Sequence, residues 1–324
     1  MEQKKESNPN YLPYPPYPPH PQQSMDNEID LRELFSALWK GKWIIIVSVF
    51  IFGTGALLYS LTLPDVYKSE ALLAPADNAN GGGLSKMASQ LGGLAAIAGI
   101  NIGNNESSQM ELSLQVLKSR KFVSSFINKH ELLVPLMAAK GWNLPEDELI
   151  FDESIYDVKF GEWLREPKGL RGSKPSDQEA YDFFVDAVLN ITQDKASGLY
   201  NLSVKYYSPY IAKQWVDWLI EDINHVMRER TIKEATKNLA YLNTQLKKTA
   251  VADMQNTFYK LIEEQTKSLM LAEVQEEFVF KVVDPSVVPE VKYEPKRYLI
   301  CFLGLLFGGL LGLIVVIVKF IFKK

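Results

Sequence analysis

The sequence predicts an α+β domain outside the cytoplasm, with a membrane-proximal mixed sheet and a long extended helical hairpin, anchored by two transmembrane helices. Two charge-free apolar segments lie near the ends of the 324-residue chain, and they predict the anchors. Short runs of alternating or β-branched residues lie between them, whereas residues 210–277 contain neither glycine nor proline. The short runs predict strands, and the uninterrupted stretch predicts the hairpin.

The first apolar segment, residues 43–63, contains no charged residue and is long enough to cross the hydrocarbon core of a bilayer. It begins too late in the chain for a cleaved signal peptide, so we expect it to be retained as an anchor. Pro64 ends this helix, and we expect the chain to leave the membrane there and to enter its first strand near Tyr67.

The second apolar segment, residues 298–318, is more apolar than the first, and a short tail at 319–324 follows it. Within it, Gly304, Gly308 and Gly312 recur at every fourth position and therefore share one helix face. Small residues at this spacing let helix backbones approach closely. The pattern predicts packing in the membrane, either against the first segment or against another subunit.

Basic residues near the two segments favour a topology with both chain termini in the cytoplasm. The flanking cations are Arg32, Lys40 and Lys42 before the first segment, Lys68 after it, Lys292, Lys296 and Arg297 before the second, and Lys319, Lys323 and Lys324 after it. The cations before the second segment oppose this orientation, but the asymmetry around the first segment is clearer. Residues 64–297 are therefore predicted to lie outside the cytoplasm.

The N-terminal part of the chain is expected to contain two different cytoplasmic regions. Residues 1–27 include the sequence YLPYPPYPPHP, whose prolines block helix and sheet, so a disordered tail is the expected structure. The alternative is a ligand for a proline-recognition or tyrosine-modifying partner. Residues 28–42 carry apolar side chains at helical spacing and predict an amphipathic helix at the membrane surface.

The region between the two apolar segments shows strand and helix patterns. Strands are predicted at 66–74, 199–207 and 278–283, helices at 110–129 with a break near Ser119 and at 177–189, and a loop containing a small-residue helix at 77–105. The strands at 199–207 and 278–283 are expected to share one sheet. The residues between them must then travel outward and return.

This return path predicts a helical hairpin over 209–277, with a turn near 248–253 and arms of about 50 Å each. Such a long hairpin cannot bury all its apolar side chains within one chain, so lateral contact between copies is expected. The helix residues predicted to make contacts between subunits are Trp215, Trp218, Leu239, Leu242 and Leu246.

Three segments occur in a characteristic order: residues 28–39 before the first span, Pro64 to Ala71 after it, and the proline-rich juxtamembrane run 284–297. The last is the most specific of the three, and its defining residues are Pro285, Pro289, Pro295, Lys296 and Arg297. In this order the segments resemble the polysaccharide co-polymerases, the Wzz-type chain-length determinants of the class without a fused kinase.

The resemblance implies a two-pass protein of the bacterial inner membrane, with a periplasmic α+β base, a long helical arm and assembly of copies into a bell-like ring. It implies action with a Wzy-type polymerase to set the length of O-antigen or a related polymer on an undecaprenyl-linked carrier. No phosphate-binding loop with a Gly-Lys-Ser/Thr ending is present, so a fused kinase is not expected.

Two other functions would also fit parts of the sequence. An envelope glycan-processing enzyme would need paired carboxylates, and residues 146–148 and 152–153 are the candidates. An adaptor of a capsule or exopolysaccharide export complex also fits two spans and a long arm. The single cysteine, Cys301, and three widely spaced histidines give no metal-site spacing, so no cofactor and no metal are expected. The chain is predicted to be non-enzymatic.

Overall fold

The computed structural model describes residues 38–76 and 105–322, which form two compact units. One contains the residues up to Ala56 and from Cys301 onward, and the other contains Leu57–Ile300. The predicted tail at 1–27, most of the predicted amphipathic helix at 28–42 and the predicted small-residue loop lie outside the described residues.

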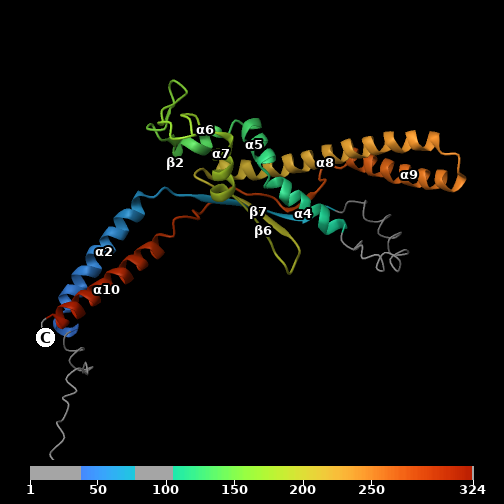
Figure 1. Cartoon of the computed structure of the whole chain (residues 1–324). Coiled ribbons are helices and arrows are strands. Elements are labelled where there is room, and N and C mark those ends of the chain that lie inside the picture. Colours follow the sequence, from blue (N-terminus) through green and yellow to red (C-terminus); the bar gives the residue numbers. More distant parts are fainter. Residues whose placement is uncertain (1–37, 77–104, 323–324) are drawn as a thin grey trace, which may run out of the picture. The chain divides into compact units, whose positions relative to one another are not determined.

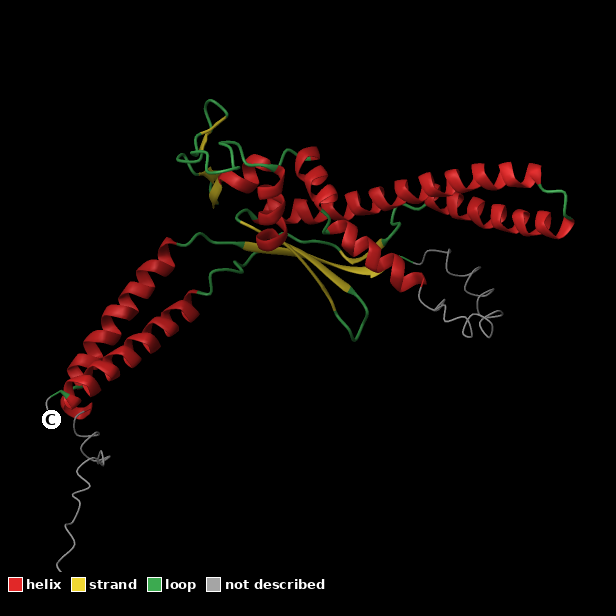
Figure 2. Ribbon diagram, viewed as in Figure 1, coloured by secondary structure: helices red, strands yellow, loops and turns green. Residues whose placement is uncertain are grey.

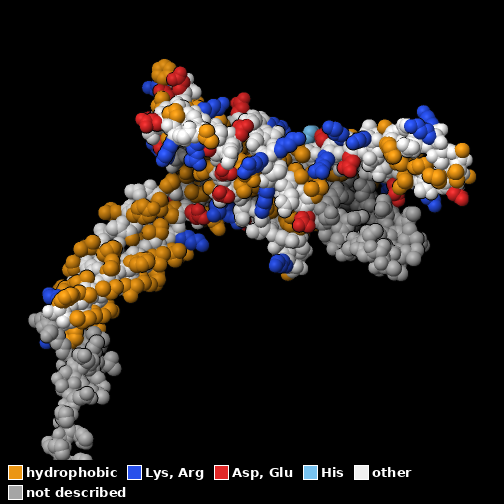
Figure 3. Space-filling model, in the orientation of Figure 1, with side chains coloured by type: hydrophobic (Ala, Val, Ile, Leu, Met, Phe, Trp, Pro, Cys, Tyr) orange, Lys and Arg blue, Asp and Glu red, His pale blue; other side chains and the backbone are white. Residues whose placement is uncertain are grey.

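Within the described residues, two helices are long and apolar enough to cross a membrane: α2 (Lys42–Thr62) and α10 (Arg297–Ile321). Helix α2 covers the predicted segment 43–63 except its last residue, and α10 covers 298–318. Most of their apolar side chains are exposed, and Figure 3 shows hydrophobic side chains covering both helices. An exposed apolar surface on this scale is expected for helices that face lipid rather than water.

Unit Leu57–Ile300 is built on a four-stranded sheet in the order β6-β7-β1-β8. Its strands are β1 (Tyr67–Pro75), β6 (Leu189–Gln193), β7 (Tyr200–Tyr206) and β8 (Phe280–Asp284). Every neighbouring pair is antiparallel, so the prediction of a mixed sheet was wrong. Strands β6 and β7 form a hairpin. Strand β1 leads the chain away from α2 and β8 leads it back toward α10, so β1 and β8 run in opposite directions.

One face of the sheet forms the core. Alternate residues of β1 and β7, including Leu73, Leu202 and Val204, are at most 1% exposed. The opposite face carries polar side chains, and Glu70 there contacts Lys68 and Asn201. An antiparallel sheet can keep one face in solvent in this way, because the side chains of a strand alternate between its two faces.

Helices cover the apolar face of the sheet, as Figures 1 and 2 show. They are α4 (Asn105–Leu117), α5 (Arg120–Lys129), α6 (Leu133–Ala138), α7 (Asp177–Phe183), the π-helical turn η1 (Phe184–Val188) and the first half of α8. The side chain of Ser119 accepts a hydrogen bond from the Phe122 amide, which starts α5 and explains the break in the predicted helix. A capping box of Ser176 and Glu179 starts α7.

The long helical hairpin consists of α8 (Pro209–Lys248) and α9 (Ala252–Val274), with residues 249–251 between them. Ser208 caps α8, and Pro209 occupies its first turn. The two arms have 40 and 23 residues, so the expectation of two equal arms was wrong. The reason is that the first half of α8 packs on the sheet, and only its second half pairs with α9.

Residues 139–163 contain two small hairpins. They are formed by β2 (Ala139–Asn143) with β3 (Glu148–Phe151), and by β4 (Tyr156–Asp157) with β5 (Glu162–Trp163).

Candidate functional site

The glycine face of α10 packs against α2. A Cβ atom added to Gly308 would lie 2.9 Å from Val49 Cα and 3.0 Å from the carbonyl oxygen of Ser48. Backbone atoms cannot move aside as the end of a side chain can, so only glycine allows this approach. Gly304 and Gly312 meet α2 in the same way. A Cβ atom added to Gly304 would meet Ala56 Cβ and lie 3.1 Å from the Phe52 carbonyl oxygen, and one added to Gly312 would lie 2.8 Å from Ile45 Cα. The sequence left two possible partners for this glycine face, the first apolar segment or another subunit. In the structure the first apolar segment packs against it.

A hydrogen bond reinforces this contact. Ser48 Oγ donates to the Gly308 carbonyl oxygen at 2.8 Å, and the close backbone approach makes the bond possible. In hydrocarbon such interhelical bonds contribute modestly, by about 0.6 kcal/mol on average. Tight packing and one polar contact together therefore hold the pair.

The juxtamembrane proline-rich run lies beside the start of β1. Asp65 accepts from Arg297 Nη2 at 2.8 Å and lies 3.2 Å from Lys292 Nζ. Val66 pairs with Glu294 as an isolated antiparallel bridge. The residue that leaves the first apolar helix and the residue that enters the second are thus held together. Of the predicted motif, Arg297 makes an ion pair, Lys296 is exposed, and Pro64 is exposed just before this contact.

The same run also contacts β1 and α8 of unit Leu57–Ile300, which is called the base from here on. Ser69 Oγ donates to the carbonyl oxygen of Val287, and Ser286 Oγ donates to Asp217 of α8. Pro289 and Pro295 are half-buried and Pro285 is exposed. Prolines suit this segment because, after β8 ends, it meets the region just before β1 through the isolated Val66–Glu294 bridge and not through a continuous ladder.

The side chain of Tyr67 packs edge-on against Trp142, with the ring centroids 5.8 Å apart. This contact joins the first strand to the β2–β3 hairpin. Tyr67 thus makes a packing contact within unit Leu57–Ile300, and its position at the membrane exit stays a prediction.

The residues predicted to contact other subunits have different positions. Trp215 is 1% exposed and packs against Tyr206 and Phe184, so it belongs to the core and its prediction as a subunit contact was wrong. Trp218 is half-buried and stacks on His130 with ring centroids 4.1 Å apart. The leucines at 239, 242 and 246 are half-buried along the second half of α8. Apolar residues recur at helical spacing along α8, but in the first half of the helix they face the sheet.

Two buried polar residues of α8 escaped the sequence reasoning. Asn224 accepts hydrogen bonds from the amides of Val279 and Phe280 at 2.8 and 3.0 Å and donates to the Phe280 carbonyl oxygen at 3.0 Å. Asp222, 6% exposed, pairs with Lys129 and lies 2.9 Å from His130 Nε2. The sequence held a sign of this for Asp222, because it lies seven residues after Trp215, at a position where the helical spacing predicts a buried apolar residue.

Three of the acidic residues proposed for an enzyme, Glu146, Asp147 and Asp152, accept local hydrogen bonds at turns, and Glu148 begins strand β3. Asp147 accepts from Trp142 Nε1, and Glu146 accepts from Asn143 Nδ2, within the β2–β3 hairpin. Asp152 accepts from the amide and hydroxyl of Ser154, and the hydroxyl bond lowers the pKa of Asp152 below its usual value. A general acid needs a raised pKa, so this geometry gives no support to the enzymatic alternative.

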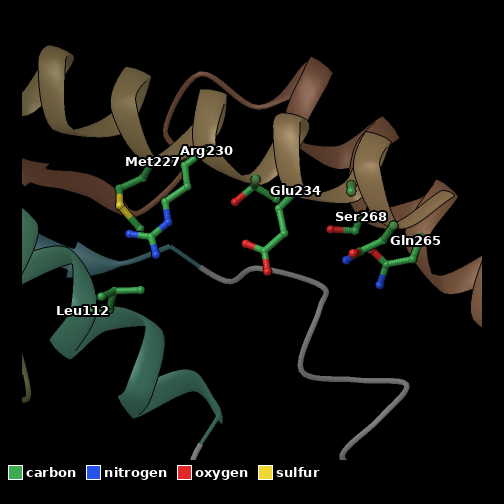
Figure 4. Close-up of a pocket in the computed structure, with 9 residues that line it drawn as sticks. Leu112, Met227, Arg230, Glu234, Gln265 and Ser268 are labelled. Carbon is green, nitrogen blue, oxygen red and sulfur yellow. The ribbon is translucent and has the colours of Figure 1, made fainter. Parts of the chain in front are cut away.

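Two depressions flank α8 within the described unit. One, of about 370 Å³, lies where α4, α8 and α9 meet and is lined by residues such as Leu112, Glu234 and Gln265. Figure 4 shows these side chains converging from the three helices. The other, here called the α5–α8 groove, has a volume of about 770 Å³. Among the residues that line the groove are Lys121, Phe122, Phe126, Lys129, Asp222, Val226, Glu229, Arg230 and Lys233.

No cluster of three or more His, Cys, Asp or Glu side chains able to hold a metal ion occurs within residues 38–76 and 105–322.

Two family models match the chain. The chain length determinant protein model (Wzz) matches residues 27–130, and the model described as the G-rich domain on putative tyrosine kinase (GNVR) matches residues 244–321. The first covers α2, β1, α4 and α5, and the second covers the end of α8, all of α9, β8 and α10.

The chain is also similar to the ferric enterobactin transport protein FepE of Escherichia coli (strain K12), with 23% identity over 237 residues. This alignment covers 73% of the chain and 59% of the relative, so it spans well under two thirds of that protein.

Two solved structures show similarity of low TM-score. A full-length bacterial polysaccharide co-polymerase matches with a TM-score of 0.37 and 15% identity, over 91% of this chain and 98% of the other. A fragment of the polysaccharide co-polymerase WzzB from Salmonella Typhimurium matches with a TM-score of 0.30 and 12% identity, over 71% and 99%. Residues 27–130 match the chain length determinant protein model (Wzz), in agreement with the resemblance at residues 28–39 and 64–71.

Proposed function

We propose that the protein is a non-enzymatic regulator of the chain length of a bacterial surface polysaccharide, the O-antigen of lipopolysaccharide. It works as a ring-like homo-oligomeric scaffold together with a Wzy-type polymerase. The observation that carries this proposal is the Wzz domain at residues 27–130, which runs from before α2, through β1, to the end of α5. The undecaprenyl-linked polysaccharide and the membrane lipid are the proposed further partners, and no nucleic acid is involved.

The proposed membrane arrangement is a two-pass protein of the inner membrane with both termini in the cytoplasm and residues 64–297 in the periplasm. The two apolar helices and the pairing of Asp65 with Arg297 support it, because both ends of the domain then return to one membrane surface. Protease added outside spheroplasts should digest the domain. Protection of the domain in intact spheroplasts would contradict this orientation.

Self-association is supported by exposed apolar side chains on the hairpin. Tyr241, Met254, Met270 and Val274 are between 51% and 81% exposed. A water-facing helix seldom carries so many large apolar side chains unless another surface covers them. A copy of the same chain is the proposed cover.

The decisive experiment is a deletion of the gene, followed by electrophoresis of the cell's lipopolysaccharide. Loss of the modal band with polymer still present supports a chain-length regulator, and the full chain supplied in trans should restore the band. Loss of all polymer would instead indicate an enzyme or an exporter.

A second candidate is an inner-membrane adaptor of a capsule or exopolysaccharide export complex. The match of residues 244–321 to a domain described on putative tyrosine kinases favours it, together with the tyrosines among residues 11–21. For this candidate, deletion should leave the lipopolysaccharide pattern unchanged and should reduce the polysaccharide released from the cells.

A further inference from the structure

We propose that the α5–α8 groove of one subunit receives the outer face of α9 from the next subunit, in a head-to-tail contact. The α9 outer face is defined by Glu263, Lys267, Met270, Glu273 and Val274, all of them exposed. This inference rests on the self-association proposed above and names the surfaces that produce it.

The groove is suited to an apolar segment with acidic neighbours. Phe122 and Phe126 form its floor together with Val226, which is 39% exposed. Four cations line it, Lys121, Lys129, Arg230 and Lys233, against the two carboxylates Asp222 and Glu229, and His225 is also present. Figure 3 shows Lys and Arg side chains along this α5 and α8 part of the molecule. The groove is therefore basic in a chain whose net charge is −4.

The α9 outer face has the opposite character. Met270 and Val274 are one helical turn apart and are 60% and 81% exposed. Glu263 and Glu273 lie on this face, and Glu276 and Glu277 follow it, whereas Lys267 is its only cation. Glu277 also accepts a hydrogen bond from the Val282 amide. The face is an acidic surface with two apolar side chains at its centre, which complements the groove.

The two surfaces lie on opposite sides of the hairpin. Residues 222, 226, 229 and 233 of α8 line the groove and residues 231, 235 and 238 line the depression beside α9, whereas Arg230 lines both. At about 100° per residue, these two sets lie on opposite sides of α8. The same reasoning applies to α9, where residues 265, 268 and 272 lie toward α8 and residues 270 and 274 lie away from it.

The two surfaces also lie at the same level along the hairpin. A hydrogen bond of 3.3 Å between Asn238 and Gln265 fixes the antiparallel register of α8 and α9. Counting from that pair places Met270 beside Lys233 and Val274 beside Glu229. Complementary surfaces on opposite sides and at one level are what a head-to-tail ring requires, because each copy then meets the next by the same rotation.

Cross-linking of the full chain tests this contact. The variant carries Val226→Cys, Val274→Cys and Cys301→Ser, and it is treated in membranes with a short bis-maleimide. Because the two thiols lie on opposite sides of one hairpin, they can be joined only between copies. We expect a ladder of oligomers from the double-cysteine chain and none from either single-cysteine chain. A mixture of the two single-cysteine chains should give dimers only.

A matched control has the same number of thiols. Val226→Cys with Tyr241→Cys places the second exposed thiol on α8, away from the α9 outer face and about 22 Å along the helix from the first. We expect no ladder from it. A ladder of equal strength would overturn the proposal, because the link would then not report the named surfaces.

Charge reversal gives a second readout. Lys233→Glu should weaken the ladder about tenfold, and adding Glu273→Lys to the same chain should restore it, since the two positions lie within one turn of the same level. Failure of the second change to restore the ladder would overturn the charge complementarity. An intact wild-type oligomer with no ladder would overturn this contact and leave the proposed function standing, whereas a strictly monomeric wild type would overturn both.

Discussion

Replacement of Gly308 by leucine is the sharpest test of the helix pair. Even the first carbon of the new side chain would lie 2.9 Å from Val49 Cα and 3.0 Å from the Ser48 carbonyl oxygen, whereas ordinary contact begins at 3.4 Å. The helices must therefore separate by at least 0.5 Å for the Cβ atom alone, and by more for the branched carbons. Separation also breaks the bond from Ser48 Oγ to the Gly308 carbonyl oxygen.

The magnitude follows from these two losses. Overpacking costs about 1–3 kcal/mol and the interhelical hydrogen bond contributes about 0.6 kcal/mol. A total near 2.6 kcal/mol corresponds to roughly eightyfold in the equilibrium between paired and separated helices. Gly308→Ala should show a smaller effect in the same direction.

The assay is double electron–electron resonance between nitroxides on cysteines placed at Val47 and Leu310, in a Cys301→Ser background. Both positions are about half exposed. The Gly308→Leu variant should give a longer and broader distance distribution than the parent. Gly55→Leu is the matched control, because a Cβ atom there meets nothing within 4 Å. An unchanged distribution for Gly308→Leu, or an equal change for Gly55→Leu, would refute the reasoning. A shifted polysaccharide length distribution on a gel is the expected cellular result.

Three further predictions concern the base and use urea or acid unfolding of the purified full chain, followed by near-ultraviolet circular dichroism. Asn224→Leu should lower the free energy of unfolding by about 3 kcal/mol or more, because the buried amides of Val279 and Phe280 lose their acceptor; a loss below about 1 kcal/mol would contradict this role. Trp215→Ala should cost about 3–5 kcal/mol as a core truncation, and a fully stable variant that loses only oligomers would restore the subunit-contact reading. The hydrogen bond from Arg165 lowers the pKa of Glu179 from 4.5 to about 2. The ionised Glu179 carboxylate therefore stabilises the fold fully above pH 4.5, and this stabilisation is lost as the pH falls toward 2. Glu179→Gln should flatten the acid-unfolding curve in this window, and an unaltered curve would show that the pair does not govern it.

The juxtamembrane contact joins the two ends of the base. Asp65 and Arg297 bring the beginning and the end of Leu57–Ile300 together, and the Val66–Glu294 bridge continues the contact into the sheet. An ion pair with side chains about one-third exposed contributes little stability by itself, about 1 kcal/mol at most. Its consequence is geometric, because it fixes where the chain enters and leaves the base.

Local signals in the sequence were sufficient for the existence and the ends of most elements. Unbroken apolar composition identified both long apolar helices, because the hydrocarbon core sets a minimum length and excludes charge. The helix break predicted near Ser119 and the hairpin start predicted at residue 209 fall where Ser119 caps α5 and Ser208 caps α8, since a serine side chain satisfies amides that the helix leaves unpaired. The turn between α8 and α9, at residues 249–251, falls within the range predicted for it.

Tertiary structure decided which surface each pattern meets. The spacing of Gly304, Gly308 and Gly312 indicated a close helix contact, but only the fold identified α2 as the partner. The apolar stripe of α8 is continuous in sequence, yet its first half covers the sheet and buries Trp215. Asn224 has its role because β8, more than fifty residues later, lies beside it. The periodicity of a sequence shows that one face of a helix is apolar. Which surface covers that face depends on segments that are distant in the chain and meet only when the whole unit folds.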